Sequence, residues 1–124
     1  MARRLIVVLT FAAVAAAFPA GAEARHQWVL CGNFGGEFAD PRHARQPVRC
    51  DVTRLGRRSG MSLLRRMNWT RWSTRAVGRG RVNGRQRVVR LRGARPCGRY
   101  GEYEVYSQIR IGRGPWQPIL YCGD

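Results

Sequence analysis

The sequence predicts an all-β protein: a small antiparallel sandwich or barrel with two disulfides, preceded by a signal peptide helix. Three observations favour this class. Short segments alternate apolar and polar residues, turns rich in Gly and Pro separate these segments, and all four cysteines lie after the apolar N-terminal region. A length of 124 residues suits a single domain.

The N-terminal region has the build of a secretory signal peptide. A short basic segment precedes an apolar run over residues 5–18, and small residues follow. We expect cleavage near Ala22 or Ala24, which gives a signal peptide at 1–24 and a secreted basic domain at 25–124. A membrane anchor is the alternative, but the apolar run is shorter than the roughly 20 residues that a spanning helix needs.

An even number of cysteines predicts disulfides in an exported protein. The four are Cys31, Cys50, Cys97 and Cys122. Three pairings are possible, and the sequence does not choose among them. We favour Cys31 with Cys50 and Cys97 with Cys122, because each bond then ties one local unit. The spacing lacks a Cys-x-x-Cys pair, and no histidine stands at ligand distance from a cysteine, so we expect no zinc or other metal and no cofactor.

Two early segments have strand character, residues 26–31 and residues 48–53. In the second, Val48, Cys50 and Val52 share one face, which indicates a half-buried strand.

The segment at residues 62–67 is ambiguous. Leu63, Leu64 and Met67 fit one face of a helix, whereas Leu63, Met67 and Trp69 also fit one face of a strand, interrupted by Arg65. We expect at most a short helix here, followed by a strand over residues 69–72.

The dipeptide Asn83-Gly84 predicts a two-residue type I′ hairpin turn. Pairing then steps outward from Val82 with Arg85, and side chains alternate between two faces. On the predicted core face, one strand carries small residues that leave space for neighbouring side chains. The pairs on this face set Ala76, Gly78 and Gly80 against Leu91, Val89 and Arg87. The opposite face is a basic surface: Val77, Arg79 and Arg81 against Arg90, Val88 and Gln86.

The sequence pattern of the C-terminal part predicts a turn, a long strand and a short edge strand. The turn is expected at residues 95–98, and the short strand at residues 116–122 is placed at an edge by Pro118. One face of the long strand is apolar: Tyr103, Val105, Ser107, Ile109 and Ile111. The other face is expected to point outward: Glu102, Glu104, Tyr106, Gln108 and Arg110.

Residues 67–111 resemble a pattern in small, uncharacterised exported β-domain proteins of actinobacteria. The matching motifs are Trp69-Thr70-Arg71-Trp72, Ala76-Val77-Gly78-Arg79-Gly80, Val89-Arg90-Leu91, Pro96-Cys97 and Tyr106-Ser107-Gln108-Ile109. Related sequences often carry extra cysteines where this chain has the tight Asn83-Gly84 turn. The resemblance implies an extracellular β domain and brings no activity.

The charge distribution suggests the partner. All 23 basic residues are Arg, seven residues are acidic, and the net charge is +16. Residues 54–99 include fifteen Arg and no acidic residue. Such a segment repels itself and attracts polyanions. The candidate binding residues are Arg79, Arg81 and Arg90 on the outer hairpin face, with Arg65, Arg66, Arg71 and Arg75 nearby in the sequence. We expect Trp69, Trp72 and Trp116 to be core residues.

Catalytic groups are sparse. The two histidines are His26 and His43, and Glu102 and Glu104 stand two residues apart on an outward strand face, where we expect them to pair with nearby Arg. We therefore expect a non-catalytic binding module for acidic polymers or anionic surfaces, with a protein target as an alternative partner and no specific small molecule. A secreted antimicrobial or enzyme inhibitor is the alternative function. A nuclease-like enzyme that uses His43 or Glu102 is the least favoured.

Overall fold

The computed structural model describes residues 26–32 and 42–122. The predicted signal peptide and its cleavage site lie outside these residues. Within the described ranges, no helix is long and apolar enough to cross a membrane.

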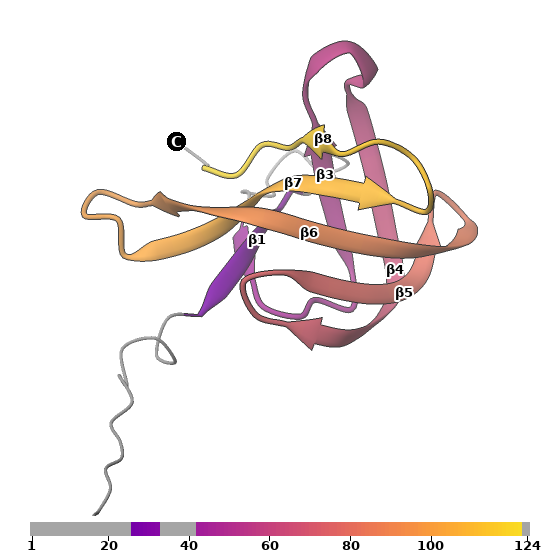
Figure 1. The fold of residues 1–124 in the computed structure, drawn as a ribbon, viewed down its shortest axis with the longest axis horizontal. Helices are drawn as coiled ribbons and strands as arrows, with labels where there is room; N and C mark the ends of the chain where they lie inside the picture. Colours follow the sequence, from indigo (N-terminus) through magenta and orange to yellow (C-terminus); the bar gives the residue numbers. More distant parts are fainter. Residues whose placement is uncertain (1–25, 33–41, 123–124) are drawn as a thin grey trace, which may run out of the picture.

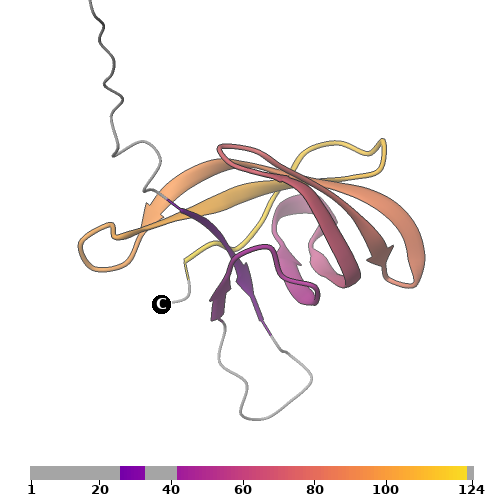
Figure 2. The same ribbon diagram turned by 90° about the horizontal axis from the view of Figure 1, so that it is seen from below.

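The chain forms one curled, all-β half-barrel sheet (Figures 1 and 2). The strand order is β2-β1-β7-β6-β5-β4-β3, and β8 pairs with β7 outside this path. The β1–β7 pair is parallel and the other pairs are antiparallel. The strands are β1 (Gln27–Cys31), β2 (Arg42–Ala44), β3 (Cys50–Arg54), β4 (Gly60–Trp72), β5 (Ala76–Val82), β6 (Arg85–Cys97), β7 (Tyr103–Ile111) and β8 (Gln117–Pro118), with a 3-10 helix η1 (Gly56–Arg58) between β3 and β4.

The C-terminal segment bridges the open side of the curl. The backbone amide of Ile119 donates to the carbonyl of Ser107 in β7 over 3.0 Å. On the other side, the amide of Leu120 donates to the carbonyl of Thr53 in β3 over 2.9 Å. This segment therefore connects β7 to β3 and covers the core between them.

Both disulfides join elements that the curl brings together. Cys31–Cys50 ties β1 to β3, and Cys97–Cys122 ties the end of β6 to the C-terminal segment. The favoured pairing is confirmed. The bonds close loops with sequence separations of 19 and 25 residues, and loops of this length stabilise a fold by about 3 kcal/mol each through restriction of the unfolded chain.

Strand β7 lies between two clusters of buried residues. Val105 belongs to a small cluster with Leu30 and Cys97, whereas the next residue, Tyr106, belongs to the main one. The expectation that Tyr106 points outward is therefore wrong, because the curl covers both faces of β7 at its centre. The main cluster comprises Val29, Cys50, Val52, Leu64, Met67, Ala76, Val82, Val89, Leu91, Tyr106, Ile109 and Ile119.

Tyr106 connects β7 to the turn after β4. Its ring packs edge-on against Trp72, with 5.3 Å between ring centroids. Its hydroxyl donates a hydrogen bond to the carbonyl of Ser73. Burial raises the pKa of this hydroxyl well above its ordinary value.

The predicted short helix at residues 62–67 is wrong, because β4 is one strand with two irregularities. The first lies between Arg65 and Asn68, and Arg66 there has a positive φ of 52°. A β-bulge adds one residue to a strand, so residues three apart can face the same side. The helix-like spacing of Leu64 and Met67, both buried, arises in this way.

The hairpin of β5 and β6 has the predicted register, with Val82 opposite Arg85 and Ala76 opposite Leu91. The glycines of β5 make room for side chains of β4. A Cβ on Gly78 would lie 2.5 Å from Cε3 of Trp69. Close packing of β5 on β4 therefore requires glycine at this position.

Two smaller expectations are corrected. Val48 is 65% exposed, because β3 begins only at Cys50. The predicted turn at residues 95–98 is still strand, since β6 continues to Cys97 and Pro96 pairs with Glu104. This part of β6 extends beyond the end of β5 (Figure 1), so Pro96 occupies an edge position where its missing N–H is tolerated.

Candidate functional site

Register places arginines from neighbouring strands on one face of the sheet. Arg71 in β4 is opposite Val77 in β5, Val77 is opposite Arg90 in β6, and Arg90 is opposite Arg110 in β7. Side chains alternate along each strand, so Arg79 and Arg81 in β5 and Arg92 in β6 point to the same side as Val77 and Arg90. We call this surface the basic outer face: Arg71, Arg75, Arg79, Arg81, Arg90, Arg92 and Arg110.

A cavity of about 190 Å³ opens on the basic outer face. Arg71, Arg75 and Arg90 line it together with Trp116, and Ala76, Val77 and Leu91 complete the wall. Among the described residues, none of those lining it is acidic. We call it the arginine cavity.

Trp116 is held at the arginine cavity rather than in the core. It is half-buried, which corrects the expectation of a core position. The guanidinium of Arg92 lies 4.0 Å from the centroid of its ring, a cation–π arrangement. The Nε of Arg92 also donates to Oε1 of Gln108 over 2.6 Å, so both the guanidinium and the indole are positioned by β6 and β7.

Like charges stand directly opposite each other on this sheet. Arg90 is paired in register with Arg110, and Arg65 with Arg81. Such pairs are destabilising in a sheet, and a bound anion would relieve the repulsion. Arg65 is partly neutralised by an ion pair, because its Nη1 lies 2.6 Å from Oδ1 of Asp51.

The structure separates the predicted binding residues into groups. Arg71, Arg75 and Arg90 meet around the arginine cavity. Arg79 and Arg81 are exposed farther along the same face. Arg65 is taken up by its ion pair with Asp51, and Arg66 is exposed at the bulge.

Sequence reasoning missed Arg92, Arg110 and Trp116 as members of this surface. The two-residue alternation that placed Arg90 outward also places Arg92 outward, and the outward face of the last long strand already included Arg110. No signal in the sequence places Trp116 there, because its position depends on the path of the loop before β8.

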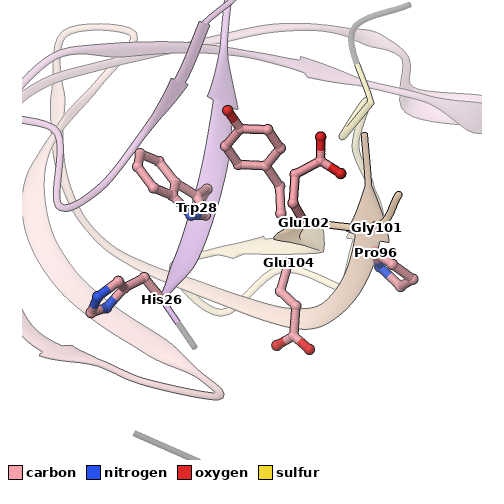
Figure 3. A pocket seen from close by; sticks show the side chains of 7 residues that line it. His26, Trp28, Pro96, Gly101, Glu102 and Glu104 are labelled. Atoms are coloured by element: carbon pink, nitrogen blue, oxygen red, sulfur yellow. The ribbon is translucent and has the colours of Figure 1, made fainter. Parts of the chain in front are cut away.

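A second cavity, of about 460 Å³, lies between the start of β1 and the hairpin of β6 and β7 (Figure 3). We call it the acidic cavity. The carboxylate of Glu104 accepts a hydrogen bond from Nε2 of Gln27 over 3.3 Å. The carboxylate of Glu102 accepts one from the backbone amide of Tyr100 over 2.9 Å. The lining residues are His26, Trp28, Pro96, Gly101, Glu102, Tyr103 and Glu104.

The acidic groups are not arranged as a catalytic pair. Figure 3 shows the side chains of Glu102 and Glu104 directed away from each other, whereas glycoside hydrolysis needs two carboxyl groups facing across the substrate. His43 stacks on Tyr103 with 5.3 Å between ring centroids, and its Nε2 lies 3.1 Å from the carbonyl oxygen of Tyr121. In the part of the chain that the structure describes, no three His, Cys, Asp or Glu side chains gather as metal ligands.

No family model, curated protein or solved structure matches this chain. The fold and the site define a class only: a small disulfide-bonded all-β protein with an arginine-rich face. The similarity to exported actinobacterial proteins stays a prediction.

Proposed function

We propose that this protein is an exported, non-catalytic binding module for acidic polymers and that the basic outer face is its binding surface. The arginine cavity carries the proposal. Three guanidinium groups from β4, the turn after it and β6 meet there beside an indole, with no acidic side chain among the described lining residues.

The chemistry of these groups suits phosphate, sulfate and carboxylate polymers. Guanidinium groups bind such anions through two parallel N–H donors. Trp116, backed by Arg92, adds a flat surface on which a ring or base can stack. The row from Arg71 to Arg110 crosses four strands, which is about 14 Å at the usual strand spacing. A polymer with several charges can therefore contact more than one arginine.

Export is supported by two features of the chain. The predicted signal peptide precedes the domain, and the two disulfides are consistent with an oxidising compartment. A polymer of the cell surface or released nucleic acid is the corresponding class of ligand.

The test measures binding to a DNA duplex, used as a model polyanion, over a series of salt concentrations. Each phosphate contact contributes about 0.9 to the slope of log K against log salt concentration. The variant with Arg71→Gln, Arg75→Gln and Arg90→Gln should therefore lose about 2 to 3 units of slope.

A matched control removes three exposed arginines away from the arginine cavity: Arg57→Gln, Arg58→Gln and Arg99→Gln. The change in net charge is identical, and we expect a loss of less than about one unit of slope. Equal losses for the two triple variants would show that the attraction is distributed over the whole surface, and the proposed site would be wrong.

A further inference from the structure

The acidic cavity has a composition opposite to that of the rest of the molecule. The structure describes three acidic residues, Asp51, Glu102 and Glu104, and two of them line this cavity. Of the 23 arginines in the chain, none is among the described lining residues. The remaining wall is largely aromatic, from Trp28 and Tyr103.

The parallel pairing of β1 with β7 builds this cavity. Gln27 is in register with Glu104, and Trp28 with Val105. Because side chains alternate along a strand, Gln27 and Glu104 point to one side of this strand pair, and Trp28 and Tyr103 point to the other. Figure 3 shows the Glu104 carboxylate directed away from the Trp28 ring, so the cavity reaches around the start of the two strands. The rings of Trp28 and Tyr103 meet edge to face, with 5.7 Å between their centroids, so the aromatic wall is a packed unit.

Aromatic rings and carboxylates together recognise cations. The electron-rich face of an indole attracts ammonium and guanidinium groups, and the attraction grows when water is excluded. The guanidinium of Arg45, which does not line the cavity, already lies 5.9 Å from the centroid of Trp28. A carboxylate adds charge-assisted hydrogen bonds to the same kind of ligand.

We propose that the acidic cavity is a second binding site, which takes an organic cation with a guanidinium or ammonium group. A volume of about 460 Å³ admits a ligand larger than a single cationic headgroup. Because Glu102 and Glu104 point in different directions, a ligand with two separated cationic groups suits the site best. The net charge of +16 does not prevent binding, because exposed charges are screened beyond about 10 Å at 0.1 M salt.

Two sources can supply this chemistry. One is a free amine or an arginine side chain of another molecule. The other is Arg25, which directly precedes the lining residue His26 in the sequence. Both sources have the same cationic chemistry, and the experiment separates them.

The probe is agmatine, which carries a guanidinium and an ammonium group joined by four methylenes, and the reporter is the indole N–H signal of Trp28 in a nuclear magnetic resonance titration. Trp116 reports on the arginine cavity, and Trp69, whose Nε1 donates to the carbonyl of Pro47 over 2.8 Å, reports on the fold. We expect agmatine to shift the Trp28 signal and to leave the Trp69 and Trp116 signals in place. Butylurea, a neutral analogue, should shift none of them.

Glu104→Gln removes the charge and keeps the shape, so it should weaken agmatine binding by roughly tenfold, the effect of losing one charge-assisted hydrogen bond. Asp51→Asn removes the same charge outside the cavity and should leave the affinity within about twofold, since screened charges at a distance contribute little. The unchanged Trp69 signal shows that each variant is folded. Glu102→Gln gives a second, independent variant with the expected weakening in the same direction.

The wild-type protein and Arg25→Gln distinguish the sources. A Trp28 shift in the wild-type protein assigns the cavity to an external cation. If agmatine shifts the Trp28 signal in the Arg25→Gln variant but not in the wild-type protein, the cavity is still a cation site, and the chain's own arginine occupies it. The proposal is overturned if Trp28 shifts in neither protein, if butylurea acts like agmatine, or if Glu104→Gln binds as tightly as the wild type. None of these results bears on DNA binding by the basic outer face.

Discussion

Gly80 sits where β5 packs most closely on β4, and replacing it by alanine tests that packing. A Cβ added there would lie 2.5 Å from Sδ of Met67, 2.7 Å from the carbonyl oxygen of Arg65 and 2.9 Å from Cα of Met67. The sulfur belongs to a flexible side chain and can move. The other two atoms belong to the backbone of β4 and can move only if the strand moves.

The expected cost follows from that backbone contact. Overpacking a well-packed site costs about 1–3 kcal/mol, and we expect Gly80→Ala near the upper end, at roughly 3 kcal/mol, because rotation of a side chain cannot relieve the clash. For a domain of this size, about 1 kcal/mol shifts the Tm by roughly 4–8 °C. The melting temperature should therefore fall by roughly 12–24 °C.

The assays are thermal denaturation of the oxidised protein, which gives the Tm, and urea denaturation, which gives the free energy of unfolding, both followed by tryptophan fluorescence. Gly84→Ala is the matched control: Gly84 has a φ of 86°, and a Cβ there would meet no atom within 4 Å. Only backbone strain of about 1–2 kcal/mol is expected for it. If Gly80→Ala lowers the free energy of unfolding by no more than Gly84→Ala does, β5 does not approach β4 as closely as described. The strand register that places the arginines on the basic outer face would then also be wrong.

Two further predictions concern stability. Tyr106→Phe removes the hydrogen bond to the Ser73 carbonyl and should lower the free energy of unfolding by about 1 kcal/mol near neutral pH. Burial raises the Tyr106 pKa in the folded state, so the wild-type protein should lose stability as the pH rises above the ordinary tyrosine pKa of about 10. The variant lacks this titrating group and should lose less stability over the same pH range. Denaturation at pH 7 and pH 11 measures both effects, and an identical pH dependence of the two proteins would contradict the burial argument. Replacing Cys97 and Cys122 together by Ala should lower the free energy of unfolding by about 2–4 kcal/mol through the loss of loop restriction, as measured by urea denaturation. An unchanged midpoint would mean that the C-terminal segment holds its place without the bond.

Local chemistry explains which parts of the fold the sequence revealed. The Asn83-Gly84 turn fixes the register of β5 and β6, and that register alone places Arg79, Arg81 and Arg90 on one outward face. The bulge at Arg66 could not be seen, because one added residue makes a strand look like a helical repeat. Local patterns predict strands and turns well when the pairing partner lies next in the chain.

Contacts between distant segments explain the rest. The parallel pairing of β1 with β7 joins residues 77 positions apart, such as Gln27 and Glu104. No local pattern specifies it, so the acidic cavity could not be predicted. Trp116 reaches the arginine cavity for the same reason, since its place depends on how the C-terminal segment crosses between β7 and β3.

In the proposed function, folding gathers arginines into a binding surface for acidic polymers. The most direct measurement is elution of the protein from a heparin column, with the oxidised, folded protein compared with the reduced, unfolded protein of identical composition. We expect the folded protein to elute at a higher salt concentration, because its basic outer face presents several arginines at once. Elution of both forms at the same salt concentration would show that the attraction comes from composition alone, and the proposed binding face would be wrong.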